Sequence, residues 1–254
     1  MLGQLTYDAH IHTSLGLGHD APRDCLRAAE GFGLEAVAFT DHYDGEESQI
    51  KPRLEEYAAA AAGSPLRVVP GASCDILDPT GRLTLPELAA KPFGLVLASL
   101  SPLTEGVARA VPVSLPALLD NLLRALVNAC RRPFVNVLSL PFALGRFEAP
   151  LTPEQIPPRL VEELGGVMAE REVAFELNNS IWAAYPEMPL GEFTEQYAHL
   201  MMAFSREGGK FILGSGSHSA AGIGNYRYAE RLAAAAGLER SQFVDLTRLR
   251  PLQP

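Results

Sequence analysis

Short apolar segments alternate with longer segments of helical periodicity along most of the chain. The short segments predict β-strands at Leu5–Ala9, Ala36–Thr40, Arg67–Pro70 continuing to Ile76, Gly94–Leu100, Phe134–Leu138, Ala174–Asn178 and Lys210–Gly214. The longer segments predict helices at Ala21–Phe32, Glu46–Ala62, Leu115–Arg131, Pro153–Glu172, Thr194–Glu207 and Tyr226–Ala236. The proline-rich residues 101–116 and 141–158 predict two long loops.

The order of these segments predicts an α/β fold. The predicted strands are mostly apolar rather than alternating, which is typical of parallel strands with both faces covered. Repeated strand-then-helix units favour a parallel barrel, closed or nearly closed, and an open doubly wound sheet is the alternative. Because no linker or internal repeat interrupts the pattern, we expect residues 1–254 to form one domain.

Charge and composition narrow the function. The net charge is -9, and an acidic chain has no basic surplus with which to release counterions from a phosphate backbone, so no nucleic-acid partner is expected. No apolar run reaches the ~18 residues of a membrane span. Cys25, Cys74 and Cys130 are too scattered for a disulfide framework. Together with an N-terminus that lacks the pattern of a signal peptide, these features favour a cytoplasmic protein.

Histidines gather where the predicted strands end. In a parallel barrel the loops after the strands share one mouth, where functional sites lie. His10 and His12 are two residues apart and share a face in extended chain. We expect one metal site from five of the six histidines, namely His10, His12, His19, His42 and His218. The sixth, His199, falls in the middle of a predicted helix and is expected to lie elsewhere.

Four segments carry a family resemblance. In their order and spacing they resemble the PHP (polymerase and histidinol phosphatase) domain family, above all its histidinol-phosphatase-like members, and they are Asp8–Thr13, Phe39–His42, Phe175–Asn178 and Leu213–His218. The resemblance implies a distorted TIM-like (β/α)7 barrel with up to three metal ions at the strand ends. It also implies hydrolysis of phosphate esters, in which the ions stabilise charge on the transferred phosphoryl group.

Four positions depart from the family pattern. Ser73 stands where the family has a glutamate that bridges two metals, and Gly216 stands where it has an aspartate. Ser101 and Leu140 stand at the places of two histidines. The resemblance therefore implies a reduced metal site with one to two ions rather than three.

The family pattern divides the five histidines unequally. It groups His19, His42 and His218 as a complete set, and three imidazoles with an open fourth position suit zinc, with manganese, iron or nickel as alternatives. His10 and His12 would hold a weaker second ion. Asp75 is two residues beyond Ser73 and is a candidate carboxylate for that ion, although a turn residue is the favoured interpretation.

Further polar residues are candidates for catalysis. Asp41 is expected to orient a metal-ligating histidine rather than to bind the ion itself. Asn178 is expected to face the same mouth and contact substrate. Arg146 and Arg227 are candidates for bidentate binding of phosphate, although solvated surface arginines are the simpler interpretation.

Two functions follow from the sequence. The first is a metal-dependent phosphoesterase-like hydrolase of a small phosphorylated substrate, with that molecule or inorganic phosphate as its ligand. The alternative is a catalytically weak or inactive relative that binds a metal or a ligand. A pure scaffold without metal is a third hypothesis. The sequence identifies neither the substrate nor the oligomeric state.

Overall fold

A single parallel sheet organises the chain. The computed structural model describes residues 5–248, and the sheet follows the order of the sequence from β1 to β7. Its strands are β1 (Tyr7–Ile11), β2 (Ala36–Phe39), β3 (Arg67–Ile76), β4 (Leu95–Leu100), β5 (Val137–Ser139), β6 (Ala174–Asn178) and β7 (Lys210–Gly214).

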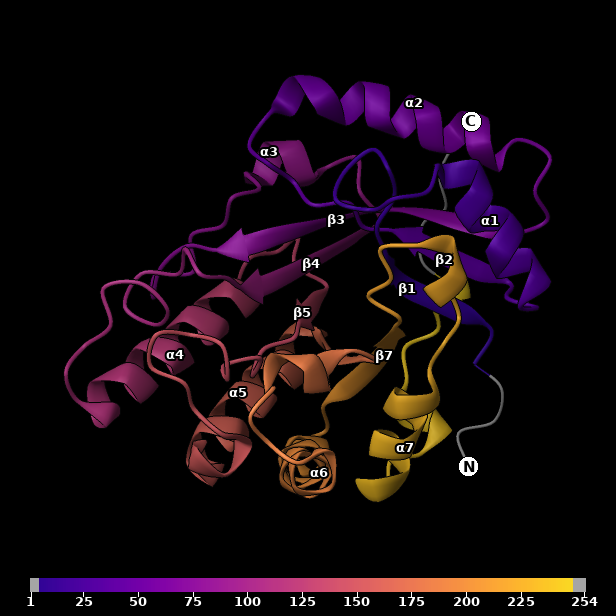
Figure 1. Ribbon diagram of the computed structural model, residues 1–254. Coiled ribbons are helices and arrows are strands. Elements are labelled where there is room, and N and C mark those ends of the chain that lie inside the picture. The colour runs from indigo at the N-terminus through magenta and orange to yellow at the C-terminus, as the bar shows by residue number, and fades with distance from the viewer. Residues whose placement is uncertain (1–4, 249–254) are drawn as a thin grey trace.

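Helices lie outside the curved sheet (Figure 1). The α-helices are α1 (Pro22–Gly31), α2 (Ile50–Ala61), α3 (Glu87–Ala90), α4 (Leu115–Cys130), α5 (Pro158–Arg171), α6 (Leu190–Arg206) and α7 (Arg227–Ala235). Short 3-10 turns include η2 (Pro153–Gln155) and η3 (Ile181–Ala184). The helices α4, α5, α6 and α7 contact one another in sequence order and form a continuous outer layer.

The first and last strands approach each other and nearly close the barrel. The amide of Gly216 donates to the carbonyl of His10 at 3.0 Å, and the amide of His12 donates to the carbonyl of Ser217 at 2.9 Å. These bonds lie at the carboxyl ends of β1 and β7, where the chain leaves both strands. The predicted (β/α)7 TIM-like barrel is confirmed, and the open doubly wound sheet is wrong.

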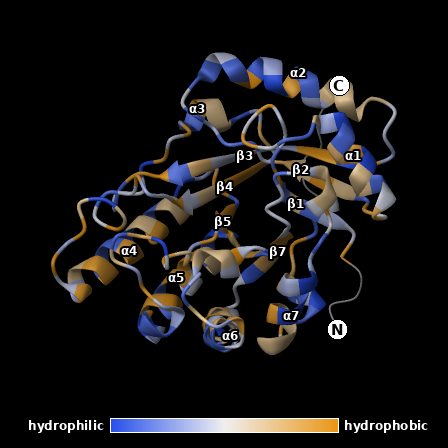
Figure 2. Cartoon of the chain, in the orientation of Figure 1, coloured by the Kyte–Doolittle hydropathy of each residue, from blue (hydrophilic) through white to orange (hydrophobic). Residues whose placement is uncertain are grey.

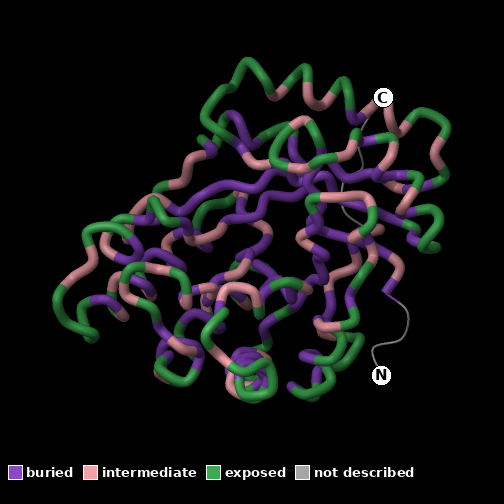
Figure 3. The backbone as a smooth tube through the Cα atoms, in the orientation of Figure 1, coloured by how far each residue is buried: buried purple, intermediate pink, exposed green. Residues whose placement is uncertain are grey.

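The strands form the buried centre of the molecule. Every residue of β1, β2 and β6 is buried, as expected for parallel strands covered on both faces. Figure 2 shows the outer helices with mixed apolar and polar faces, and Figure 3 shows burial concentrated along the strands. No helix within residues 5–248 is long and apolar enough to cross a membrane.

Element boundaries differ from the predicted ones in two informative places. β1 begins at Tyr7 rather than Leu5, because Tyr7 is the first residue paired with Ala36 of β2. The shift places His10 inside the strand instead of in the loop that follows. α6 begins at Leu190, four residues before the predicted Thr194, directly after Pro189; proline at such a position is compatible with a helix start.

The barrel closure depends on a buried carboxylate. Asp8 Oδ1 accepts hydrogen bonds from the amides of His10 (3.2 Å) and Ser215 (3.0 Å), and its Oδ2 accepts one from the amide of Gly224 (3.1 Å). Asp8 is fully buried, so these bonds replace its lost hydration and tie β1 to the segment after β7.

We expect Asp8→Ala to lower the free energy of unfolding by about 3 kcal/mol, because it leaves three amide donors without their acceptor. Urea unfolding followed by circular dichroism measures this. Asp120→Ala is the control. That carboxylate is exposed and forms a long, 3.8 Å ion pair with Arg124, so its loss should change the free energy of unfolding by no more than about 0.5 kcal/mol. Equal effects of the two substitutions would contradict the role given to Asp8.

Candidate metal centre at the strand ends

Three histidine rings meet at the carboxyl ends of β1 and β7. His10 Nε2 and His12 Nε2 are 3.0 Å apart. The ring of His12 stacks on that of His218, with 4.3 Å between centroids and 18° between planes. The expectation that residues after different strands share one mouth therefore describes these three side chains well.

A carboxylate from β6 orients the first of these rings. Glu176 Oε1 lies 2.6 Å from His10 Nδ1 and accepts a second hydrogen bond from Asn178 Nδ2 at 2.9 Å. Its other oxygen accepts one from the Ser139 hydroxyl at 2.5 Å. When the neutral His10 ring carries its proton on Nδ1 and donates to Glu176, its Nε2 lone pair faces His12, as in metal-binding histidines whose second nitrogen is held by a carboxylate.

Electrostatics around Glu176 follow from the same contacts. Burial raises the pKa of the Glu176 carboxyl, but the charge of His10 and the hydrogen bonds from His10, Ser139 and Asn178 together outweigh burial, so the net pKa is lowered. Burial lowers the pKa of His10, but the charge of Glu176, the hydrogen bond to it and the charge of Asp8 together outweigh burial, so the net pKa is raised. The sequence motif contained Glu176, but its role was missed because only the fold brings β6 opposite β1.

His12 is a buried, neutral imidazole whose surroundings suit a metal ligand. Burial lowers the pKa of His12 to about 2, and the charges of His10, His218 and His42 add to the effect. The ring is therefore neutral at physiological pH, with one nitrogen lone pair available to a ligand and one N–H. Its Nδ1 is buried and has no hydrogen-bond partner among the described residues. A buried imidazole nitrogen of this kind costs free energy unless a further group pairs with it.

His42 faces a different carboxylate. Its Nε2 lies 3.4 Å from Asp75 Oδ2, and its carbonyl accepts a hydrogen bond from Arg53 Nη1 at 3.1 Å. Asp75 lies within β3, so the favoured interpretation of a turn residue is wrong. The continuous pairing of β3 with β4 carries the strand as far as Ile76, which keeps Asp75 in extended chain.

His19 and His218 lie at the outer rim of the mouth and are exposed. The His19 amide donates to the His218 carbonyl at 2.8 Å, and the His218 ring contacts the Leu17 carbonyl through Nδ1 at 3.1 Å. These contacts join the two loops. Among residues 5–248 no recorded side-chain contact joins His19 to His42, so their grouping with His218 stays a prediction.

Asp41 acts on the chain beside the histidines rather than on a ring. It accepts hydrogen bonds from the Thr13 amide at 2.6 Å, from the Thr13 hydroxyl at 2.5 Å and from the Tyr57 hydroxyl at 2.5 Å. These three hydrogen bonds hold the carboxylate against the turn that follows His12. No recorded hydrogen bond of the described residues joins Asp41 to a histidine ring, so the expected orienting role of Asp41 stays a prediction that would act through this turn.

The remaining candidates lie in different surroundings. Asn178 is buried and donates to Glu176, so in this structure it positions that carboxylate. A Cβ at Gly216 would come within 2.5 Å of Asn178 Nδ2, so an aspartate there would displace the amide. Arg146 is exposed in the loop after β5, and Arg227 is exposed at the start of α7. Arg53, half-buried on α2, was missed by the sequence reasoning.

The four departures from the family pattern place no imidazole or carboxylate at their positions. The backbone of Ser73 is paired with the chain around Asp41, and the Ser101 hydroxyl accepts the Leu103 amide at 3.1 Å. Leu140 packs against the core. Within residues 5–248 no three His, Cys, Asp or Glu side chains already surround one ion-sized position.

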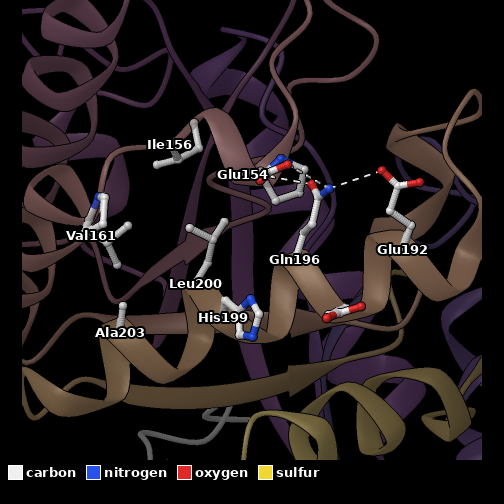
Figure 4. Close-up of a pocket in the computed structure, with 11 residues that line it drawn as sticks. Glu154, Ile156, Val161, Glu192, Gln196, His199, Leu200 and Ala203 are labelled. Carbon is white, nitrogen blue, oxygen red and sulfur yellow. Dashed lines mark hydrogen bonds between the residues drawn. The ribbon is translucent and has the colours of Figure 1, made fainter.

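A groove on the outer surface contains the sixth histidine. It runs between η2, α5 and α6, and Figure 4 shows His199 at its edge with Glu154 and Glu192. Gln196 Nε2 donates to Glu192 Oε1 at 3.2 Å and to Glu154 Oε2 at 3.4 Å. Because carboxylates repel phosphate, this groove does not suit a phosphorylated ligand.

The sequence is similar to proteins named as phosphatases, although no protein-family model matches it. A probable phosphatase from Thermoanaerobacter sp. (strain X514) is 23% identical over 250 residues, covering 92% of this chain and 88% of the relative. A probable phosphatase from Clostridium acetobutylicum is 22% identical over 250 residues, covering 94% of this chain and 89% of the relative.

Two solved structures share the fold. Histidinol phosphate phosphatase from Lactococcus lactis subsp. lactis, complexed with zinc, L-histidinol and phosphate, superposes with a TM-score of 0.68 at 18% identity, covering 97% of this chain and 99% of that chain. A chain of an archaeal ribonuclease P bound to mature tRNA superposes with a TM-score of 0.56 at 15% identity, covering 90% of this chain and 88% of that chain. The same barrel therefore occurs in a phosphatase and in a ribonuclease P, so the fold alone does not identify the function, which depends on the site residues.

We expect Glu176→Gln to weaken zinc binding by about 10- to 100-fold, the range typical when the carboxylate behind a ligating histidine is lost. Competition with a chromophoric chelator measures the affinity. The glutamine preserves the size of the side chain, so circular dichroism should stay unchanged. Glu195→Gln on the outer face of α6 serves as the control. Unchanged zinc affinity in Glu176→Gln would show that this carboxylate supports only the fold.

Proposed function

We propose that the protein is a metal-dependent phosphoesterase of the PHP type that acts on a small phosphorylated molecule. The observation that carries the proposal is the line of Glu176, His10, His12 and His218 at the barrel mouth. It unites a buried carboxylate, an oriented imidazole and a buried neutral imidazole with an unpaired nitrogen. A purely structural cluster would gain nothing from that unpaired atom.

The comparisons support the same function. Relatives that span most of the chain are named probable phosphatases, and a structure of this fold was obtained with zinc and phosphate. The histidine-rich strand ends supply the ligand types of such a site. The net charge of -9 disfavours the alternative suggested by the ribonuclease P neighbour, a nucleic-acid surface.

Five histidines would hold one to two divalent ions, namely His10, His12, His19, His42 and His218. An imidazole-rich set favours zinc, with manganese or iron as alternatives. When bound, such an ion supplies a nucleophile at neutral pH and neutralises charge on the phosphoryl group. Glu176 would keep His10 in the tautomer with its Nε2 lone pair free. Asp41 would hold the turn after His12, and thereby the direction of that ring.

Arg53 is the preferred candidate for binding the substrate phosphate. Its guanidinium is already fixed next to His42 by a hydrogen bond to that residue's carbonyl, and a fixed guanidinium loses less entropy when it binds phosphate. Arg146 remains the second candidate, from the loop after β5. The two differ in that no recorded hydrogen bond or ion pair of the described residues holds Arg146 near the histidines.

A catalytically weak relative is the second candidate function. Ser101 and Leu140 provide no imidazole where the family has one, and both already have structural partners. A site with fewer ions stabilises less charge during phosphoryl transfer, which favours binding over turnover. Activity measurements separate the two functions.

The proposed function predicts hydrolysis of one or more phosphomonoesters by protein loaded with zinc, manganese or iron. A panel that includes histidinol phosphate and sugar phosphates, with release of phosphate as the readout, tests it. Chelation should abolish activity, and His12→Ala should lower kcat/KM by about 100-fold or more because a metal ligand is lost. Equal turnover in His12→Ala and the parent would contradict catalysis at this site. Absence of turnover with every metal would favour the catalytically weak relative.

Arg53→Ala should raise the Kd for inorganic phosphate by about 10-fold, the effect of losing one charged hydrogen bond. Isothermal titration of zinc-loaded protein measures it, and the zinc content shows whether the metal site survived. Arg146→Ala, compared in parallel, should change the Kd by less than about two-fold. The reverse pattern would assign phosphate binding to Arg146.

A further inference from the structure

Asp75 occupies a place in the fold that the surrounding chain controls closely. It pairs with Ser99 in the ladder between β3 and β4. Its amide donates to Thr84 Oγ1 at 3.0 Å, and its carbonyl accepts the Thr84 amide at 3.0 Å. Because both backbone groups are satisfied, the direction in which the Asp75 side chain leaves the strand is fixed.

Asp75 and Ser73 share one face of β3, since alternate strand residues point the same way. The chain at Ser73 is bridged to His42, and the contact of the Asp75 side chain with the His42 ring shows that this face of β3 is the one beside the metal-binding candidates. Asp75 is only 9% exposed. A buried carboxylate requires a cation or several donors to offset its lost hydration.

The contact between Asp75 and His42 has an unusual length. The distance from Asp75 Oδ2 to His42 Nε2 is 3.4 Å, whereas charge-assisted hydrogen bonds of this type are about 2.7–2.9 Å long. Two ligands of one tetrahedral ion, each bonded at about 2.0–2.1 Å, lie about 3.4 Å apart. Among the described residues, His42 is the sole recorded side-chain partner of this carboxylate.

We propose that Asp75 and His42 bind one divalent cation together. Asp75, two residues after Ser73 on the same face of β3, would supply the carboxylate that Ser73 lacks. This inference rests on the proposed metal-dependent function and changes its ligand set. It joins His42 to a carboxylate of β3 and leaves the exposed His19 dispensable. The site would then retain one carboxylate that can bind an ion directly, in addition to Glu176, which is committed to His10.

The test compares Asp75→Asn with Asp44→Asn. Asparagine preserves the shape of the side chain but removes the charge that makes carboxylate a good ligand. Asp44 is exposed two residues beyond His42, so its variant controls for loss of negative charge near the site. Thermal unfolding in the presence of chelator checks that neither substitution damages the metal-free fold.

Asp75→Asn should bind zinc at least ~10-fold more weakly than Asp44→Asn and the parent. Loss of a residue that only supports a metal ligand already weakens binding by about 10- to 100-fold, and loss of a ligand itself should weaken it at least as much. The visible spectrum of the cobalt-substituted protein should also change in Asp75→Asn alone. Equal affinities and equal spectra would overturn the proposal, and so would failure of the parent to bind zinc, cobalt or manganese.

The activity panel separates this inference from the proposed function. A parent that binds zinc through Asp75 but hydrolyses no phosphoester would sustain the ligand assignment and contradict the phosphoesterase. A parent that hydrolyses phosphoesters, together with an Asp75→Asn variant that retains its zinc affinity and cobalt spectrum, would contradict the ligand assignment and sustain the enzyme. His19→Ala should retain the zinc affinity of the parent within about two-fold, as expected for an exposed residue outside the ligand set.

Discussion

The hydrogen bond between His10 and Glu176 is the contact on which the arrangement of the site depends. It spans 2.6 Å between side chains of β1 and β6, two strands that are not neighbours in the sheet and whose side chains meet because the sheet curves into a barrel. Burial makes the bond strong and also makes either partner costly if left alone. In the neutral ring it favours the proton on Nδ1, which leaves the Nε2 lone pair facing His12.

Barrel closure and site assembly are therefore parts of one structure. The residues that join β1 to β7 are the neighbours of the residues that carry imidazoles, and Asp8 performs the joining with its buried carboxylate. Asp41 repeats the principle beside it, by holding Thr13 in the turn after His12. Carboxylates here are used chiefly to fix the backbone, which leaves Glu176 and Asp75 to act on histidines.

Much of this could be predicted from the sequence, because apolar periodicity and strand-end histidines are local signals. The bounds of β6 and β7 match the prediction, and the convergence of His10 with His12 follows from their spacing. The contact of Glu176 with His10 could not be predicted in this way, and Asp75 was a candidate by its spacing from Ser73 but not as the partner of His42. Each depends on which residue of a distant strand lies opposite, a matter of register and barrel curvature. The family pattern specifies a ligand at the position of Ser73 and none at that of Asp75.

Anomalous diffraction from crystals grown with zinc and phosphate tests the central claim most directly. The account predicts a zinc peak within coordination distance of His12 at the carboxyl ends of the strands, about 2.0–2.1 Å from a ring nitrogen, with phosphate beside it. Zinc and phosphate absent from the mouth, or zinc found only at His199 in the outer groove, would contradict it.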